Sequence, residues 1–437
     1  MYRLAMMMVA LFLGSGCTHS VHAGPSPERA GGVESAAESV PSKLAAPVTA
    51  LTSALAGCSS QIPKRLPRHV FVIMLENEDY DQTFGKSEPP LEFKELMKDG
   101  ELLSEYYGIG HNSLDNYIAL ISGQAPNPAT QGDCPYFAKF LDMEHETEIK
   151  NHIVLKMKDH FGLLPQGESD DGQAPDYGQA IGVGCVYPER VMTIANQLQS
   201  RSTPLQWRAY MEDMPERCRH PAIGEKDDTR AGPYVVRHNP FAYFDSLLKD
   251  GSCKKSDRPL GSTNPAKPGL ARDLAKEPPP AFVFISPNLC SDGHNDCGQG
   301  KLNQVSTFLR AWVPVIKQSA AYQDDGMIII TFDEAEVSSK VSGAALKKNK
   351  AASTRCCNEL PGPFAEHPGI FGDGGGKVGA LILSPLVESG KKNNHPFNHY
   401  ALLRSVEDMF QLEHLGFAQP TDLKTFQECD VFKPDES

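Results

Sequence analysis

Three apolar, strand-like segments of this sequence run directly into acidic or amide side chains. The segments are HVFVIML, AFVFISP and MIIITF. Buried carboxylates are costly unless something positive compensates them, and oxygen ligands combined with histidine suit divalent cations. A single acidic pair at a strand end is more often a helix cap or a solvated loop, but three such ends in one domain favour a metal site. The candidate ligands are Glu76, Asn77, Asp292, His294, Asp333, Glu334 and His399.

A serine stands where an apolar helix should begin. The stretch GIGHNSLDNYIALISGQ predicts a helix from about Leu114, with Ser113 near its N-cap and Asn116 close to the same face. A helix start presents backbone N–H groups that attract a phosphoryl oxygen. Beside a metal ion, the Ser113 hydroxyl would lose its proton more readily and become a nucleophile. The alternative is that Ser113 only caps the helix.

Five further side chains are candidates for roles in or around this site. His111 and His238 are expected to hold phosphate or to protonate a leaving group, because imidazole titrates near neutrality; the alternative is a structural histidine. Lys377 follows the turn GDGGG, which lacks the spacing of a phosphate-binding loop, but its side chain has the length to reach a substrate. Cys290 and Cys297 bracket His294 and form either a disulfide, which we favour, or part of a zinc site.

The elements that must position these residues alternate between strand and helix. Buried strands are predicted at 69–75, 281–287, 327–334 and 377–385, with helical patterns at 191–200, 301–322 and 399–412. This alternation predicts an α/β fold with a central, mostly parallel sheet flanked by helices, and such sheets carry their sites at the carboxyl ends of the strands. The segment LQWRAYMEDM adds a strand to the same sheet or to an insertion, and the stretches 125–185 and 253–280 are predicted loops.

The N-terminus has the pattern of an export signal over residues 1–23. Two cleavage sites compete: a lipoprotein box ending at Cys17, which we favour, and an ordinary signal-peptidase site after Ala23. Without Cys17, an even number of the eleven cysteines remains, which suits disulfides in an oxidising compartment. We therefore expect a periplasmic or outer-membrane lipoprotein, or a secreted protein.

Composition limits the domains and partners. The 437 residues leave room for one large domain, which we place at 66–437 after a flexible tether at 18–65 rich in Ala, Ser, Pro and Gly. The net charge of −13 argues against nucleic-acid binding through a general basic surface. Contact with a membrane is expected only through a lipid anchor, and the sequence leaves the oligomeric state open.

Several ordered motifs resemble one known family. The motifs are HNSLDNYIALISGQAPNP, GCVYPERVMTIANQL, RHNPFAYFDS, SPNLCSDGHNDC, ITFDEAE and NHYALLRSVEDMFQLEHLG. Together they resemble the bacterial phosphoesterase family that joins acid phosphatases and phospholipases C, in the alkaline phosphatase superfamily. The likeness covers about residues 66–420.

This resemblance implies an alkaline phosphatase-like fold and a role for each matching residue. Two positions depart from related proteins: Asp115 stands where nucleotide pyrophosphatases have proline, and Glu334 stands where the superfamily has histidine. The metal ions are therefore left open among Zn, Ca, Mg and Mn. The implied roles are Ser113 as nucleophile, Asn116 as phosphate contact, Glu76 with Asn77 at the first metal position, Asp333 with Glu334 at the superfamily's Asp-His pair, and Asp292, His294 and His399 in the other ligand loops.

We expect an exported, metal-dependent, acid phosphatase-like enzyme that hydrolyses phosphate monoesters through a phosphoserine intermediate. One alternative is a phosphodiesterase of the phospholipase C type. Another is a non-catalytic, metal-containing lipoprotein that acts as a binding module. Sulfatase activity is disfavoured because no Cys-x-Pro-x-Arg or Ser-x-Pro-x-Arg motif surrounds Ser113.

Overall fold

The computed structural model describes residues 63–142, 177–275, 279–336 and 372–434, with Cys58 and short stretches between 354 and 369. The predicted export signal, Cys17 and nearly all of the predicted tether lie outside the described residues. No helix among the described residues is long and apolar enough to cross a membrane.

An eight-stranded sheet organises the domain, with the strand order β11-β2-β10-β9-β1-β8-β6-β7. Its central strand β1 (His69–Leu75) pairs in parallel with β8 (Phe282–Ser286) and with β9 (Gly326–Phe332). Only β10 (Ala380–Leu383) runs against its neighbours, so the sheet is mostly parallel, as predicted. All residues of β9 and nearly all residues of β1 are buried. Their continuous apolar sequences predicted this, because a strand that is covered on both faces needs apolar side chains along its whole length.

The remaining elements connect and cover this sheet. The other strands are β2 (Glu101–Leu103), β3 (Tyr106–Tyr107), β4 (Leu141–Asp142), β5 (Gly182–Val183), β6 (Trp207–Met211), β7 (Asp257–Pro259), β11 (Lys392–Asn393) and β12 (Phe397–Asn398). The α-helices are α2 (Leu91–Asp99), α3 (Ser113–Ser122), α5 (Ile194–Ser200), α6 (Asp245–Leu248), α7 (Ser252–Ser256), α8 (Leu270–Leu274), α9 (Lys301–Lys317), α10 (Ala320–Gln323) and α12 (His399–Met409). The 3-10 turns are η2 (Tyr80–Gln82), η3 (Thr130–Gly132), η4 (Val236–His238), η5 (Pro240–Tyr243) and η6 (Gly416–Ala418).

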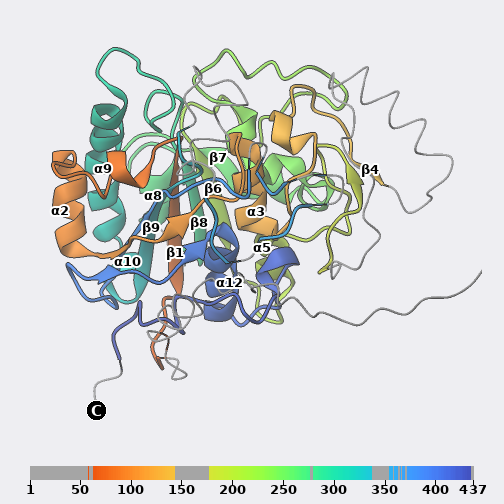
Figure 1. The fold of residues 1–437 in the computed structure, drawn as a ribbon. Helices are drawn as coiled ribbons and strands as arrows, with labels where there is room; N and C mark the ends of the chain where they lie inside the picture. The colour runs from red at the N-terminus through yellow and green to blue at the C-terminus, as the bar shows by residue number, and fades with distance from the viewer. Residues whose placement is uncertain are drawn as a thin grey trace, which may run out of the picture. The chain divides into compact units, whose positions relative to one another are not determined.

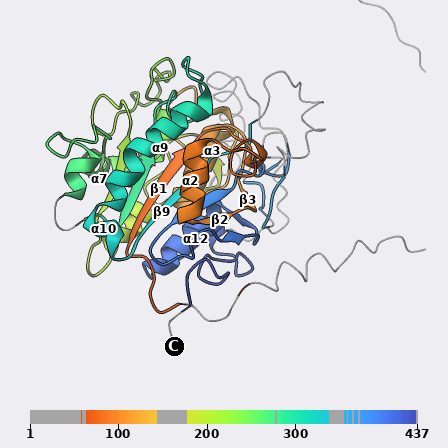
Figure 2. The ribbon, with the colours of Figure 1, turned by 90° about the vertical axis from the view of Figure 1, so that its left-hand side faces the viewer.

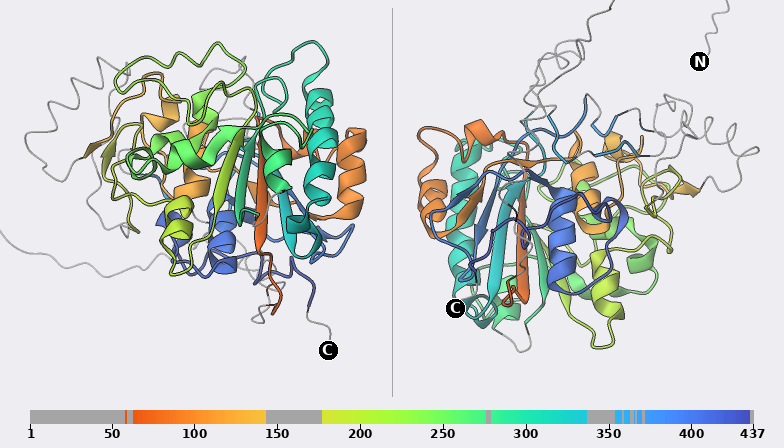
Figure 3. Two further views of the ribbon diagram at one scale, coloured as in Figure 1. Left: turned by 180° about the vertical axis from the view of Figure 1, so that it is seen from behind. Right: turned by 60° about the horizontal axis from the view of Figure 1, so that its bottom comes forward.

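Helices cover both faces of the sheet. Figure 1 shows α2 and α9 on one side of the strands and α3, α5 and α12 on the other. The view in Figure 2 looks onto α2 and α9, which lie over β1 and β9. Figure 3 shows the same layers from behind and from below. Helix α9 buries an apolar stripe that includes Val305, Leu309 and Val313.

The structure answers two sequence predictions about the edge of the sheet. The segment LQWRAYMEDM forms β6, which belongs to the main sheet and pairs with β8. The prediction that 253–280 is a loop was wrong, because this stretch contributes to α7 and contains β7 and α8. The polar sequence DRP of β7 has no strand pattern of its own, and it is extended because β6 supplies the hydrogen-bonding edge.

Five disulfides pair all ten cysteines that the structure describes. Cys290 pairs with Cys297, which is the bond that we favoured over a zinc site. The pairs that complete the set are Cys58–Cys429, Cys134–Cys185, Cys218–Cys253 and Cys356–Cys357.

Candidate active site

Carboxylates from three neighbouring strands meet at one edge of the sheet. Glu76 follows β1 directly, Asp333 follows β9 directly, and Asp292 lies in the loop after β8. The backbone ties these ends together, since Glu76 N donates to Asp292 O at 2.9 Å and Asp333 N donates to Leu75 O at 2.9 Å. All three acidic side chains are fully buried.

The three carboxyl groups repel one another in a fully buried site. Burial raises the pKa of Glu76 well above its usual range, and the charges of Asp333 and Asp292 raise it further. Burial raises the pKa of Asp333 in the same way, with added repulsion from Glu334. Burial also raises the pKa of Asp292. Three such groups ionise together only if a positive charge joins them.

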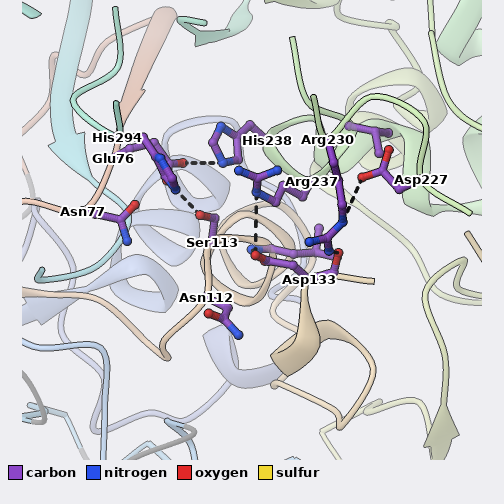
Figure 4. A network of polar contacts seen from close by, with 12 residues as sticks. Glu76, Asn77, Asn112, Ser113, Asp133, Asp227, Arg230, Arg237, His238 and His294 are labelled. Atoms are coloured by element: carbon purple, nitrogen blue, oxygen red, sulfur yellow. Dashed lines mark hydrogen bonds and ion pairs between the residues drawn. The ribbon is translucent and has the colours of Figure 1, made fainter. Parts of the chain in front are cut away.

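Ser113 is hydrogen-bonded to this cluster. Its hydroxyl donates to Glu76 Oε2 at 2.8 Å, and the side chain is buried at the first residue of α3. One turn later, the Tyr117 hydroxyl donates to the second oxygen of Glu76. A single carboxylate therefore receives two hydroxyl donors from one face of α3 (Figure 4 shows Ser113 and Glu76).

The start of α3 differs from the prediction. We expected the helix-start N–H groups to be available to phosphate, but Leu114 N donates to Asp133 Oδ1 at 3.1 Å. A carboxylate from a loop distant in sequence thus binds the first turn, where the helix dipole favours negative charge. The Ser113 side chain does not cap its own helix; its hydroxyl turns to Glu76 instead.

His238 lies between two of the carboxylates. Its Nε2 is 3.3 Å from Glu76 Oε1 and its Nδ1 is 3.4 Å from Asp292 Oδ2, and its ring stacks on Tyr117 at 5.3 Å between centroids. Burial lowers the pKa of His238, and the charge of Arg237 lowers it further. A neutral imidazole between two carboxylates has the donor types of a metal ligand.

The buried donor atoms fit a divalent cation. One oxygen each of Glu76 and Asp292 and one nitrogen of His238 lie within 4.8 Å of one another. Asn77 Oδ1, Asp292 Oδ2 and Asp333 Oδ2 are buried without a hydrogen-bond partner, as are both ring nitrogens of His238. Unpartnered oxygens of this kind, with one imidazole, match the preferences of Mg, Ca, Mn or Zn and do not select one of them.

Asn77, Glu334 and His111 form a second layer beside the cluster. Asn77 N donates to Asp333 Oδ1 at 2.9 Å, and its side-chain amide donates to Glu334 Oε1 at 2.8 Å. His111 Nδ1 contacts the other oxygen of Glu334. We had expected His111 to hold phosphate or to protonate a leaving group. In the structure its ring pairs with the carboxylate of Glu334 instead.

His399 is not placed as a metal ligand. Its Nε2 lies 2.7 Å from the backbone oxygen of Asp333, and its Nδ1 lies 3.0 Å from the Tyr106 hydroxyl. A carbonyl oxygen only accepts, so Nε2 carries the hydrogen and Nδ1 accepts from Tyr106. Burial lowers the pKa of His399 to about 4, which keeps the ring neutral. Both ring nitrogens are used in holding the backbone that carries Asp333.

Two predicted substrate contacts are also placed differently. Asn116 is fully buried, and its side-chain oxygen accepts from Ile109 N and Gly110 N at 2.7 and 3.1 Å. Its amide nitrogen donates to Gly110 O at 3.1 Å and to Asn112 O at 3.4 Å, so the side chain holds the loop before α3 and both of its N–H donors are used inside the chain. Lys377 pairs with Glu105 and lies 4.6 Å from the centroid of the Tyr80 ring, so its charge is already balanced.

Sequence reasoning missed three residues of this site. Tyr117 stands four positions after Ser113, a spacing that indicates the same helix face. Arg237 directly precedes His238, and Figure 4 draws both beside Ser113. Asp133 carries no signal in the sequence, because its place at the start of α3 depends on the path of a loop.

The backbone at the site adopts unusual conformations. Asn77, Asn112 and Asp133 have φ angles of 45°, 71° and 55°, in the left-handed region that non-glycine residues rarely occupy. Asn77 and Asn112 are partly buried, as is His294, whose Nδ1 lies 2.9 Å from Asn295 Oδ1. These three residues border Ser113 and Glu76 in Figure 4. Strained backbone of this kind is typical of functional sites, where it directs side chains toward a ligand.

Comparison with known proteins identifies the family. The model of the Phosphoesterase family matches residues 87–413, which include α3, the turns η4 and η5, and β8 to β10. This chain belongs to the Phosphoesterase family. The matched region contains Ser113, His238, Asp292 and Asp333, whereas Glu76 and Asn77 lie just before it.

Similar proteins include fungal acid phosphatases. A probable acid phosphatase from Kluyveromyces lactis is 24% identical over 349 residues, covering 80% of this chain and 59% of that protein. An acid phosphatase from Aspergillus fumigatus is 22% identical over 346 residues, covering 79% of this chain and 55% of that protein. The chain thus spans little more than half the length of these relatives.

Solved structures with a similar course of the chain include two proteins of low identity. One is a protein in the alkaline phosphatase superfamily from Vibrio parahaemolyticus, with a TM-score of 0.43 and 12% identity, covering 87% of this chain and 72% of that one. The other is a lipoteichoic acid synthase from Listeria monocytogenes, with a TM-score of 0.43 and 9% identity, covering 87% and 82%. At these scores the likeness carries no argument about the site.

Proposed function

We propose that this chain is a phosphatase of acid phosphatase type, in which Ser113 attacks the phosphorus of a phosphate monoester. One observation carries the proposal: the Ser113 hydroxyl donates to Glu76 Oε2 at 2.8 Å inside a cluster of buried, mutually repelling carboxylates. A serine that only capped a helix would have no reason to face three acidic groups. Membership of the Phosphoesterase family and the names of the fungal relatives support the same activity.

The side chains that would hold a divalent cation are Glu76, Asp292, Asp333 and His238, with Asn77 and Glu334 beside them. When bound, such a cation lowers the pKa of a serine hydroxyl and balances the charge on a phosphoryl group. In this assignment His238, which we had grouped with the proton donors, joins the ligands. His399 leaves them, because its ring nitrogens are bonded elsewhere.

The reaction uses the chain's own groups in order. Glu76 and the first turn of α3 fix the Ser113 oxygen, which forms a bond to phosphorus as the bond to the leaving alcohol breaks. The alcohol takes up a proton, for which we propose His294, a partly exposed histidine at the edge of the cluster. During the attack the Ser113 proton passes to Glu76 Oε2, to which the hydroxyl already donates. Water then attacks the phosphoserine and releases phosphate, one proton of that water goes to His294, and Glu76 returns its proton to the Ser113 oxygen.

Replacing Ser113 tests the nucleophile. We expect Ser113→Ala to lower kcat/KM for p-nitrophenyl phosphate by about a thousandfold or more, since loss of a nucleophile usually costs that much. The matched control is Ser122→Ala at the other end of α3, where the hydroxyl donates to Ile118 O at 2.7 Å and accepts from Gln124 N at 3.2 Å, away from the carboxylate cluster. Turnover by Ser113→Ala close to that of the unchanged protein would exclude Ser113 as nucleophile, whichever ester is hydrolysed.

Removal of metal tests the cation. We expect chelation to abolish phosphatase activity, and elemental analysis of the purified protein to find a divalent metal that Asp292→Asn binds more weakly. Full activity in protein shown to be metal-free would refute this part of the proposal and leave the serine assignment standing.

We also propose that the protein is exported. The pairing of all ten described cysteines supports this, because disulfides persist mainly in oxidising compartments. Mass spectrometry of the mature N-terminus from the source cell tests the two cleavage sites. A lipid on Cys17 or a chain beginning at Gly24 agrees with export, and an intact N-terminus in the cytoplasmic fraction contradicts it.

A further inference from the structure

Arg237 is a buried arginine beside the site with almost no partner. Its side chain is 9% exposed, and its Nε lies 3.7 Å from Asp133 Oδ2. Within the described ranges, this ion pair is the one polar contact recorded for the side chain, and no hydrogen bond to it is found. A guanidinium carries five N–H donors, and none of the Arg237 nitrogens is among the fully buried atoms that lack a partner, so they still reach the space outside the chain. The geometry therefore leaves these donors available to an acceptor from outside the chain.

The position of Arg237 connects it to the nucleophile. Its partner Asp133 also accepts the N–H of Leu114, the residue directly after Ser113. Its positive charge partly opposes the effect of burial, which raises the pKa of Asp292, so its field reaches the carboxylate cluster. In Figure 4 the guanidinium lies between His238 and Asp133, on the side of Ser113.

A purely structural role for Arg237 fits poorly. An arginine that served only to neutralise Asp133 would approach it at hydrogen-bond distance with both prongs of its guanidinium. The neighbouring Arg230 already stabilises this loop, since its Nη2 donates to Asp133 O at 2.6 Å and its Nε lies 3.5 Å from Asp227 Oδ2. Arg230 thus spends a hydrogen bond on the loop, whereas no hydrogen bond among the described residues engages the Arg237 guanidinium.

We propose that Arg237 binds the phosphoryl group of the substrate through two hydrogen bonds and makes the site select phosphate monoesters over diesters. This inference rests on the proposed function and names the substrate class that the same site prefers. The planar fork of a guanidinium matches two oxygens on one phosphorus, which an ammonium group cannot do. Asp133 is the positioning residue that keeps the guanidinium beside Ser113.

The charges of the two substrate classes explain the selectivity. A monoester has three unesterified oxygens and carries up to two negative charges near neutral pH, whereas a diester has two such oxygens and one charge. A positive fork beside the nucleophile therefore gains more from a monoester.

Kinetics on paired substrates test the proposal. We expect Arg237→Ala to lower kcat/KM by about a hundredfold for p-nitrophenyl phosphate and by less than about tenfold for bis(p-nitrophenyl) phosphate, since hydrogen bonds to charged groups are strong. Arg237→Lys keeps the charge but not the fork, and should recover part of the loss. Added guanidinium ion should restore part of the monoester turnover of Arg237→Ala. Arg230→Ala is the matched control and should leave the ratio of the two values unchanged, and thermal unfolding shows that each variant folds.

Binding of inorganic phosphate to the Ser113→Ala protein gives a second readout that needs no turnover. Titration calorimetry should show at least about tenfold weaker binding when Arg237→Ala is added, and no weakening when Arg230→Ala is added. Equal loss for both substrate classes, an unchanged ratio, or unchanged phosphate affinity in a folded Arg237→Ala protein would each overturn the proposal. If the unchanged protein hydrolyses no phosphate ester, the proposed function fails, and the titration alone decides whether Arg237 binds phosphate.

Discussion

At the scale of single residues, Glu76 is the side chain on which the site depends. Its two oxygens receive the hydroxyls of Ser113 and Tyr117, and His238 lies 3.3 Å away. Burial and the neighbouring acids raise the pKa of Glu76, so the carboxyl resists ionisation when no cation is near. Glu76 therefore couples the binding of a cation to the position of the Ser113 hydroxyl, because the same carboxylate takes part in both.

His399 shows how a buried histidine can serve a site without touching the ligand. We expect His399→Phe to keep the metal content of the protein, because neither ring nitrogen is directed at a cation. The change should lower the free energy of unfolding by about 1–3 kcal/mol, since it leaves the Tyr106 hydroxyl and the Asp333 carbonyl without partners. Elemental analysis and denaturant unfolding measure the two effects. Loss of bound metal in a folded His399→Phe protein would restore His399 to the ligands.

Asp257 should make stability depend on pH. Burial raises its pKa to about 7, although Asn239 Nδ2 donates to it at 2.7 Å, whereas an unfolded aspartate ionises near pH 4. Between these values the folded state holds a proton that the unfolded state has lost. Stability should therefore fall as pH rises from about 4 to about 7, by at most about 1.4 kcal/mol per pH unit from this group.

Thermal unfolding of Asp257→Asn at pH 5 and pH 7.5 checks this expectation. The variant should gain stability relative to the unchanged protein as the pH rises, because its side chain no longer ionises. Asp81→Asn, at an exposed position, is the control and should follow the pH dependence of the unchanged protein. The same dependence in Asp257→Asn would show that another group causes it.

At the scale of elements, α3 is held at three points. Asn116 fastens the preceding loop at Ile109 and Gly110, and Asp133 accepts the N–H of Leu114. At the other end, Gly123 closes the helix in the left-handed conformation, with its N–H bonded to Ala119 O. The position of Ser113 thus depends on where the helix begins and ends as well as on its own contacts.

Gly123→Ala should displace α3. Gly123 has a φ of +67°, and an added Cβ would lie 2.1 Å from the backbone oxygen of Leu415, which cannot easily move. Gly251 has a similar φ of +76°, but nothing lies within 4 Å of its added Cβ. We expect Gly251→Ala to cost about 1–2 kcal/mol and Gly123→Ala clearly more, because only the latter adds a backbone clash to the strain.

The comparison of these two glycine variants uses denaturant unfolding and kcat. A shift of α3 should also lower turnover in Gly123→Ala, whereas Gly251→Ala should keep it. If both substitutions lower the free energy of unfolding equally, the backbone around Leu415 must move away from the added Cβ at no cost in stability.

At the scale of the whole domain, the fold joins parts of the chain that are far apart in sequence. Strand β1 lies between β8 and β9, although more than 200 residues separate it from either one. The Cys58–Cys429 disulfide spans 371 residues and fastens the start of the described domain to its C-terminal segment. A covalent link of this length removes many conformations from the unfolded chain.

Removing that link should destabilise the domain. We expect Cys58→Ala with Cys429→Ala to lower the free energy of unfolding by about 2–5 kcal/mol, as is typical for native disulfides. The control is the adjacent pair Cys356–Cys357, with a sequence separation of 1, which closes no long loop. Its replacement by alanines should cost much less in the same unfolding experiment. A cost that is equal for both pairs would argue against the loop-entropy explanation.

The sequence alone was enough for features that depend on local pattern. Continuous apolar runs predicted β1, β8, β9 and β10, because a strand buried on both faces cannot carry polar residues along its length. The same runs located the acidic residues at the strand ends, and the apolar period after Ser113 predicted α3. The family motifs, which are also local, led to the Phosphoesterase family that the comparisons support.

Tertiary structure alone decided which side chains share a partner. The sequence grouped Glu76, Asp292 and Asp333 in one site, but it could not show that β1 lies between β8 and β9, because strand order follows from how helices pack on the sheet. It also could not show that the polar groups of Asn116 and His399 are used up inside the protein, or that those of Arg237 are not. The type of a side chain determines which contacts and reactions it can make. Whether its polar atoms are available to a ligand depends on which atoms from distant parts of the chain already bond to them.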